Sequence, residues 1–271
     1  MKLEEIRIIG SDGAIATLFE KRLSTRERGE AEAVARLRGE ARLLSLLGGH
    51  VTPRLVDTGD DERGPWLRTA KLPFPTLAHR LDAVTATAAA TGADTPSLDV
   101  GWLERAVEAA LGALAALHEA ADAVGPLSIV HADVSPANLA LDDAGTCAFL
   151  LDLELASWRE APSPRDGAFR GTLAYCAPET ARGEPPTVAS DLFALAATFL
   201  HAMTGAAPRT GPSFAALLAA AAERPLLDGH PHLASGHLAA RGPAHALVAR
   251  CLAHAPNERP ASAREALAML R

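Results

Sequence analysis

The sequence is poor in cysteine, in aromatic residues and in lysine. Its three cysteines are widely spaced and form no CxxC pair, which argues against a disulfide framework and against a zinc site. The net charge of −7 gives no electrostatic reason to expect binding to nucleic acid or to a membrane. The chain lacks an apolar run of about 18 residues and an apolar stretch behind its first residues. We therefore expect neither a membrane span nor a signal peptide, and a cytoplasmic location.

The composition is that of an ordinary globular protein. The 271 residues suffice for one large domain or two small ones packed together. Because aromatic residues make up only 4% of the chain, alanine and leucine must fill most of the core. Lys2, Lys21 and Lys71 are the only lysines, so nearly all positive charge is carried by arginine. This bias, with the abundant alanine, is typical of a GC-rich bacterial genome.

The first 70 residues predict a small α+β unit. Two strand-like segments, 3–9 and 14–21, flank the turn sequence Gly10-Ser11-Asp12-Gly13 and predict a hairpin that ends near Lys21. Residues 27–47 carry apolar side chains at helical spacing, and Gly48-Gly49 follows as a helix stop. Short apolar runs at 54–57 and 66–70 predict two further strands.

The remainder of the chain predicts a mainly helical unit. Residues 71–76 contain two prolines and read as a connector, and residues 84–97 read as a flexible insertion rich in alanine and threonine. A helical pattern begins at Asp99. Short strands are expected at 139–141 and 147–151, around a second hairpin turn.

Five short motifs follow one another in the second half of the chain. They are residues 131–138 (HADVSPAN), 151–154 (LDLE), 171–179 (GTLAYCAPE), 190–193 (SDLF) and 256–260 (PNERP). In this order and at these separations they resemble the signatures of the eukaryotic-type protein kinases, in a divergent bacterial form. The resemblance covers residues 14–271, more sharply in the second half than in the first.

The resemblance implies an α+β, two-lobed kinase fold. Residues 1–72 would form a small β-rich lobe with one helix, and residues 73–271 a larger helical lobe with the catalytic loop and activation segment. The implied function is the transfer of the γ-phosphate of ATP to a protein hydroxyl, of the serine or threonine type. ATP and Mg²⁺ or Mn²⁺ are the implied cofactors.

Phosphoryl transfer requires positioning of the triphosphate and neutralisation of its charge, much of it by a magnesium ion bound to oxygen ligands. Asp152 and Asn138 are the candidate metal ligands. Asp133, five residues before Asn138, is the candidate base that accepts or orients the substrate hydroxyl. Ordinary turn acids would be the alternative reading of Asp133 and Asp152.

Members of the family hold the phosphates with a strand lysine paired to a helix glutamate. Lys21 is the only lysine in a suitable place, because Lys2 precedes the first strand and Lys71 lies in the connector. Glu40 is the expected partner, with Glu30 and Glu32 as rivals. The alternative for Lys21 is a solvated strand end.

Other motif positions have structural roles in the family. Glu179 and Arg259 resemble its buried ion pair, which is costly to break from one side. Asp191 resembles the residue that accepts backbone hydrogen bonds from the loop that begins at His131; a helix N-cap, with Ser190 as competitor, is the alternative. Thr172 resembles the threonine that contacts the catalytic aspartate, and it favours a protein substrate.

Departures from the family pattern limit these expectations. The segment Gly10–Gly13 is either a shortened phosphate loop or, as we expect, a plain turn, in which case the first strand and the cover of the phosphates are missing. Ala132 replaces an arginine that reads a phosphate on the activation segment, so phosphorylation of that segment is not expected to be the switch. Ser135 replaces a lysine, which predicts slower catalysis unless Arg165 or Arg170 compensates. Glu154 replaces a glycine and is either a metal ligand or a surface side chain.

Two other functions compete with an active protein kinase. A pseudokinase, acting as a binding or scaffold module, is favoured by the missing phosphate cover and by the changes at Ala132 and Ser135. A small-molecule kinase is suggested by the acidic pair Asp152 and Glu154. The expected partners are ATP and a protein substrate or regulatory protein. The bare edge of the small lobe also favours a homodimer through that lobe.

Overall fold

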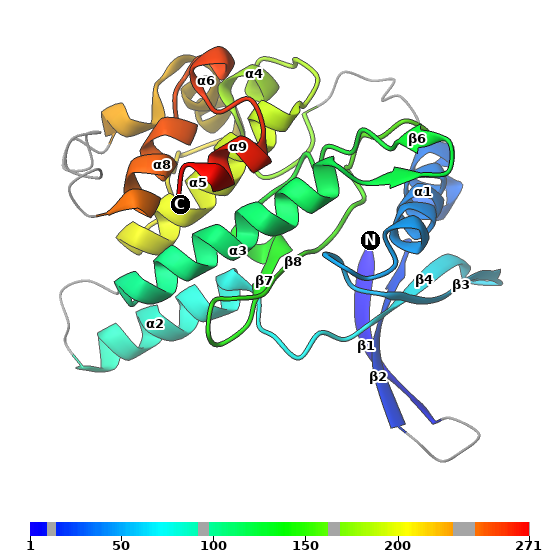
Figure 1. Cartoon of the computed structure of the whole chain (residues 1–271). Coiled ribbons are helices and arrows are strands. Elements are labelled where there is room, and N and C mark those ends of the chain that lie inside the picture. Colours follow the sequence, from blue (N-terminus) through cyan, green and yellow to red (C-terminus); the bar gives the residue numbers. More distant parts are fainter. Residues whose placement is uncertain (10–14, 92–97, 162–168, 230–241, 271) are drawn as a thin grey trace.

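The chain folds into two lobes, one built on a β-sheet and one mainly helical (Figure 1). The structure is a computed structural model and describes residues 1–9, 15–91, 98–161, 169–229 and 242–270. The α+β, two-lobed architecture expected from the sequence is confirmed. The boundary between residues 72 and 73 stays a prediction, although the chain passes between the lobes there.

The small lobe consists of one antiparallel sheet and one long helix. The sheet has the strand order β1-β2-β4-β3. Its strands and the helix with its leading 3-10 turn are β1 (Lys2–Ile9), β2 (Ile15–Arg22), η1 (Glu27–Gly29), α1 (Ala31–Leu47), β3 (Leu55–Asp61) and β4 (Gly64–Ala70). Helix α1 packs on β3 and β4 through buried leucines such as Leu37 and Leu44. Gly48, at φ 63°, adopts the left-handed conformation that ends the helix.

The strand register decides where Lys21 lies. Lys21 is opposite Leu3 on β1 and Leu67 on β4, so β2 lies inside the sheet, and the Lys21 side chain is buried at 7% exposure. The described end of β2 at Ile15 is six residues away, or about 20 Å along the strand. The choice between a shortened phosphate loop and a plain turn for Gly10–Gly13 stays a prediction. Residues 10–14 themselves lie outside the described residues.

The large lobe is built around two long helices, α3 and α5, whose apolar faces form the main core. Phe193 and Phe199 of α5 are among its largest fully buried side chains. Its helices are α2 (Leu77–Thr91), α3 (Val100–His118), α4 (Pro178–Ala181), α5 (Val188–Thr204), α6 (Phe214–Glu223), α8 (Pro243–Cys251) and α9 (Ala263–Ala268). Its short strands and 3-10 turns are β5 (Ala121–Asp122), β6 (Gly125–Pro126), η2 (Pro136–Asn138), β7 (Leu139–Leu141), β8 (Ala148–Leu150), η3 (Leu226–Gly229) and η5 (Pro256–Glu258).

The prediction of a flexible insertion at residues 84–97 is wrong for the first half of that segment. Helix α2 continues to Thr91, and its residues Leu77, Leu81 and Ala88 are buried. Alanine has the highest helix propensity, so an alanine-rich stretch that continues a buried helix face remains helical. Residues 92–97 lie outside the described residues. No helix in the described part of the chain has the length and apolar character needed to cross a membrane.

Candidate active site

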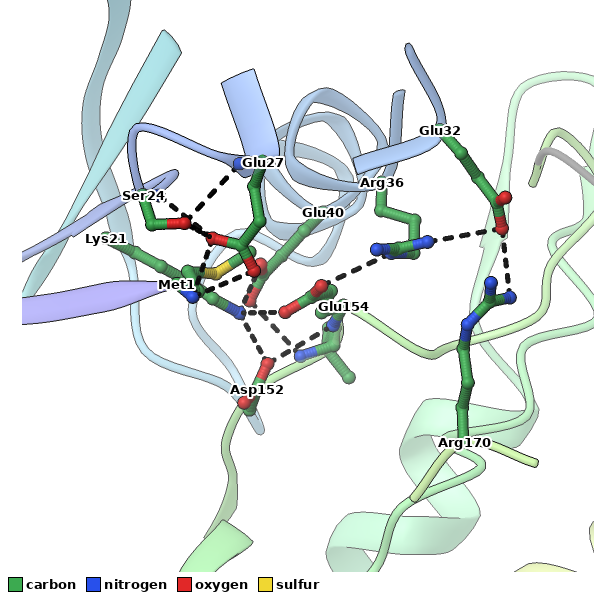
Figure 2. A network of polar contacts seen from close by, with 11 residues as sticks. Met1, Lys21, Ser24, Glu27, Glu32, Arg36, Glu40, Asp152, Glu154 and Arg170 are labelled. Atoms are coloured by element: carbon green, nitrogen blue, oxygen red, sulfur yellow. Dashed lines mark hydrogen bonds and ion pairs between the residues drawn. The ribbon is translucent and has the colours of Figure 1, made fainter. Parts of the chain in front are cut away.

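Lys21 lies at the centre of a cluster of carboxylates between the lobes (Figure 2). Its Nζ atom is 2.8 Å from Glu40 Oε2 and 2.5 Å from Asp152 Oδ1, and Glu154 Oε2 follows at 3.4 Å. Glu40 comes from α1, while Asp152 and Glu154 follow β8. The solvated strand end considered for Lys21 is therefore wrong, and its partner is Glu40 among the three glutamates considered.

The electrostatics of this cluster follow from one ammonium group among three carboxylates. Burial alone lowers the pKa of Lys21, but the charges of Glu40, Asp152 and Glu154 outweigh it and raise this pKa above its ordinary value. Burial raises the pKa of Glu40 to about 7, against the opposing effect of Lys21. An excess of negative charge thus surrounds Lys21, and an added cation near Asp152 would relieve it.

The backbone after β8 fixes the position of Asp152. Asp152 has φ 58°, in the left-handed region that non-glycine residues seldom occupy. The next amide, of Leu153, donates to Glu40 Oε1 at 3.2 Å, so Glu40 holds both Lys21 and the backbone beside Asp152. One glutamate of α1 therefore joins β2 to the segment that follows β8.

Helix α5 holds the start of the loop from His131 to Asn138 through hydrogen bonds to Asp191. The carboxylate of Asp191, which is 1% exposed, accepts hydrogen bonds from the amides of His131 (2.7 Å) and Ala132 (2.9 Å). Ala132 has φ 66°, and the His131 ring contacts the carbonyl oxygen of Leu151. The helix-cap alternative for Asp191 is wrong, because Thr187 is the N-cap of α5 and forms a capping box with Ser190.

Asp133, in the catalytic loop (residues 131–138), is held in place by that loop and by the activation segment, which runs from Asp152 to Glu179. Thr172 donates to Asp133 Oδ1 from its amide at 2.9 Å and from its hydroxyl at 2.8 Å. Asn138 Nδ2 donates to Asp133 Oδ2 at 3.1 Å and to its carbonyl oxygen at 2.9 Å. Burial raises the pKa of Asp133, while the bonds from Thr172 lower it in part. Within the described residues, the carboxylate is thus oriented by three donors, and no lysine or arginine is paired with it.

Glu179 and Arg259 form a buried, two-pronged ion pair. Arg259 Nη1 is 2.6 Å from Glu179 Oε1, and Arg259 Nη2 is 2.9 Å from Glu179 Oε2. Their side chains are 3% and 0% exposed, respectively. Arg259 also donates to the carbonyl oxygens of Ala189, Ala253 and His254. The pair joins the end of the activation segment to the last helices of the chain.

A cleft of about 860 Å³ opens beside these residues and is large enough for a nucleotide. Its lining includes five predicted site residues, which are Lys21, Glu40, Asn138, Asp152 and Glu154. Apolar side chains such as Phe19, Leu67 and Phe74 line the part next to the connector. Asp133 is outside this lining but hydrogen-bonds to Asn138, which lies in it.

The donor set suits a divalent cation that is completed by phosphate oxygens. Asn138 directs its amide nitrogen to Asp133, which leaves the amide oxygen for a cation, and Asp152 adds a carboxylate. Among the residues described, no three His, Cys, Asp or Glu side chains form a metal cage. Mg²⁺ commonly binds through one or two protein oxygens together with substrate phosphates, so the residues present fit it.

The sequence reasoning missed Arg36 and left the contacts of Arg170 and Glu154 unassigned. Arg36 on α1 contacts Glu154 at 3.2 Å, and Arg170 contacts Glu32 at 2.9 Å. The i, i+4 spacing of Glu32, Arg36 and Glu40 was the available signal, because it places all three on one helix face. Glu154 is only 19% exposed, so the surface alternative for it is wrong. Arg165, the other arginine considered as compensation, lies outside the described residues.

Comparisons with known proteins agree with this geometry. The family model described as "Protein kinase domain" matches residues 92–269. Serine/threonine-protein kinase PknL of Mycobacterium tuberculosis is 30% identical over 194 residues, which are 71% of this chain and 44% of PknL. Probable serine/threonine-protein kinase PkwA of Thermomonospora curvata is 29% identical over 181 residues, 66% of this chain and 22% of PkwA.

A solved structure extends the likeness to the small lobe. The crystal structure of a variant of the Mycobacterium tuberculosis PknI kinase domain has a TM-score of 0.63 and 22% identity, and covers 99% of this chain and 94% of that one. It supports the fold alone. The chain spans less than half the length of the two curated relatives named above. Motif order, cleft geometry and the match over residues 92–269 together show that this chain belongs to the protein kinase domain family.

Proposed function

We propose that this chain is an ATP-dependent protein kinase that transfers the γ-phosphate of ATP to serine or threonine hydroxyls. One observation carries the proposal. Lys21 contacts both Glu40 and Asp152, while Asp133 is hydrogen-bonded to Thr172 and Asn138 beside the same cleft. The family implies the use of ATP and of a divalent metal ion. Mg²⁺ is the cation we expect, from the oxygen donors present.

Each residue has a task that its surroundings suit. Lys21, kept charged by neighbouring carboxylates, supplies a cation for the phosphates. Asn138 and Asp152 would hold the metal ion, which neutralises phosphate charge when bound. Asp133 orients the substrate hydroxyl and accepts its proton at a carboxylate oxygen. Glu40 holds Lys21 in place and takes no part in proton transfer.

A protein substrate is favoured by the segment beside Asp133. Thr172 bonds to the carboxylate, and Leu173 and Cys176 pack with Ala181 and with Ala221 of α6 in a separate apolar cluster. This packed segment forms a surface next to Asp133 on which an extended peptide could lie. The relatives' names, serine/threonine-protein kinases, support the same substrate class.

A pseudokinase is the second candidate, and specific residues favour it. Ser135 stands at the position where the family has a lysine, and its uncharged hydroxyl supplies no cation to the reaction site. Ala132 likewise provides no charge. Against it, the cleft is open and the candidate base, lysine and metal ligands all lie beside it.

One assay separates these functions. Purified protein is incubated with labelled ATP, with Mg²⁺ or Mn²⁺, and with a generic protein acceptor, in parallel with Asp152→Asn and Asp133→Asn. We expect phosphate incorporation by the parent protein only. Incorporation equal in all three proteins would point to a contaminating kinase and refute the proposal. Absence of incorporation together with absence of a thermal shift by ATP would leave a scaffold module.

The small lobe also presents a candidate partner surface. Strand β1 pairs only with β2 in the described sheet, so its other edge is open, and Leu3 and Ile8 on it are exposed. A homodimer through this edge stays a prediction. Light scattering tests it, and a strict monomer at high concentration would exclude it.

A further inference from the structure

Charged side chains of alternating sign continue outward from the Lys21 cluster (Figure 2). Glu154 Oε1 is 3.2 Å from Arg36 Nε, and Arg36 Nη1 is 3.2 Å from Glu32 Oε1. The same Glu32 oxygen is 2.9 Å from Arg170 Nη1. We call these four residues, Glu154, Arg36, Glu32 and Arg170, the ion-pair relay. It joins the segment after β8, helix α1 and the activation segment.

Both carboxylate oxygens of Glu154 are engaged by cations. Oε1 contacts Arg36, and Oε2 is 3.4 Å from Lys21 Nζ. Metal binding by Glu154 would require it to leave one of these partners, whereas the described part of the chain contacts Asp152 at Oδ1 only. Of the two carboxylates, Glu154 is therefore suited to hold Lys21 and Arg36, and Asp152 to hold the metal.

The far end of the relay is attached to the residues that orient Asp133. Arg170 lies between Phe169, whose ring is 6.3 Å from that of Phe214 on α6, and Thr172, which bonds to Asp133. Gly171, at φ 111°, passes so close that a Cβ atom there would be 3.4 Å from Asp133 Oδ1. A displacement of Arg170 would therefore move the backbone that donates to Asp133.

The relay thus spans the two halves of the site, with Lys21 at one end and the Asp133 contacts at the other. Ala132, beside Asp133, stands where the family has an arginine, so its side chain offers no positive charge to a phosphorylated residue. The contact between Arg170 and Glu32 joins the activation segment to α1 directly, with a carboxylate of the chain where a phosphate would otherwise be needed.

We propose that the ion-pair relay positions Lys21 and the activation segment together and makes this arrangement independent of phosphorylation. Glu154, Arg36, Glu32 and Arg170 are positioning residues, since they act through Lys21, Glu40 and Thr172. The proposal rests on the proposed function, because it concerns the groups that would act on ATP and on the hydroxyl. Couplings carried by such networks change activity by about 3- to 30-fold.

The first test measures Lys21 itself and needs no catalytic activity. The protein has only three lysines, so acylation of Lys21 by an amine-reactive ester is quantified by peptide mass spectrometry with Lys2 and Lys71 as internal references. We expect Glu154→Gln, Glu32→Gln and Arg170→Gln each to increase Lys21 labelling about two- to tenfold, because the buried Lys21 side chain is then held less firmly and is exposed to the reagent more often.

The control breaks a matched ion pair elsewhere. Glu119 and Arg264 contact each other at the end of α3, away from the cleft, so Glu119→Gln removes one charge without touching the relay. Its Lys21 labelling should equal that of the wild type. Wild-type labelling in Arg170→Gln and Glu32→Gln would overturn the proposal, since the far end of the relay would then not reach Lys21.

The second test uses phosphatase-treated protein and kinetics. Arg170→Gln and Glu32→Gln should each lower kcat/KM for ATP. The double variant should fall no further than Glu32→Gln alone, because that change already breaks the contact with Arg170, and Arg170→Lys should recover part of the decrease caused by Arg170→Gln. Additive decreases, no rescue, or loss of wild-type activity after phosphatase treatment would overturn the proposal.

A metal role for Glu154 predicts a different pattern. Glu154→Gln alone would then raise the Mg²⁺ concentration required, with Arg36→Gln and Arg170→Gln unchanged, and this result would also overturn the relay. If the wild type transfers no phosphate at all, the proposed function fails, while the labelling experiment still decides whether the relay holds Lys21.

Discussion

Replacing Glu179 with glutamine is expected to destabilise the protein strongly without changing the size of the side chain. The change leaves the Arg259 guanidinium buried, with its side chain fully covered and without a counter-charge. Breaking a buried pair from one side costs about 3–5 kcal/mol of unfolding free energy. With about 2.1 cal/mol/K of unfolding entropy per residue, the 271 residues give about 0.6 kcal/mol/K. The melting temperature should therefore fall by about 5–9 °C.

Differential scanning calorimetry measures this effect against two comparison variants. Glu119→Gln, which breaks the exposed pair with Arg264, should lower the melting temperature by no more than about 2 °C. The double replacement of Glu179 and Arg259 by methionine should be milder than either single change, because it removes the unpaired charge. A Glu179→Gln variant as stable as the Glu119→Gln variant would refute the reasoning.

Three further predictions concern the cleft. Burial raises the pKa of Glu40 to about 7, so the folded protein binds a proton at Glu40 more tightly than the unfolded chain does. This contribution to the unfolding free energy is complete below the ordinary pKa of 4.5 and is lost as the pH rises to about 7. Over this pH range the wild type should lose about 3 kcal/mol more unfolding free energy than Glu40→Gln, as measured by denaturant titration at each pH. An equal dependence of the unfolding free energy on pH in the two proteins would contradict this. Thr172→Val removes a bond that lowers the pKa of Asp133, so the acid limb of the kcat/KM profile should move to higher pH, and an unmoved limb would count against Asp133 as the base. Phe19→Ala removes an aromatic ring from the cleft lining and should weaken ATP binding about 5- to 100-fold by calorimetry, if the base stacks there; equal affinity would exclude stacking.

Much of the small lobe could be predicted because its signals are local. The hairpin that carries Lys21 and the helix that carries Glu40 follow from alternation, helical spacing and the glycines behind them. The exact start of the helix could not be predicted, since residues 27–29 form a 3-10 turn before α1 begins at Ala31. The alanine-rich end of α2 was misread because composition alone does not show which face is buried.

Lys21 and Glu40 could be paired from the sequence by elimination and motif order, but their contacts could not. Whether Glu154 lies on the surface or beside Lys21 depends on how α1 packs against the segment after β8. The contact between Arg170 and Glu32 joins residues 138 positions apart and has no signal in either local sequence.

The sequence by itself determined the order of the elements, the family and the chemical types present at the site, because these depend on local spacing and on short motifs. Only the tertiary structure decided that a single ammonium is shared by Glu40, Asp152 and Glu154, and that Arg36 and Arg170 extend this network. The reason is physical: the strength of a charge contact depends on distance and burial, and both are set only when the two lobes and the activation segment pack together.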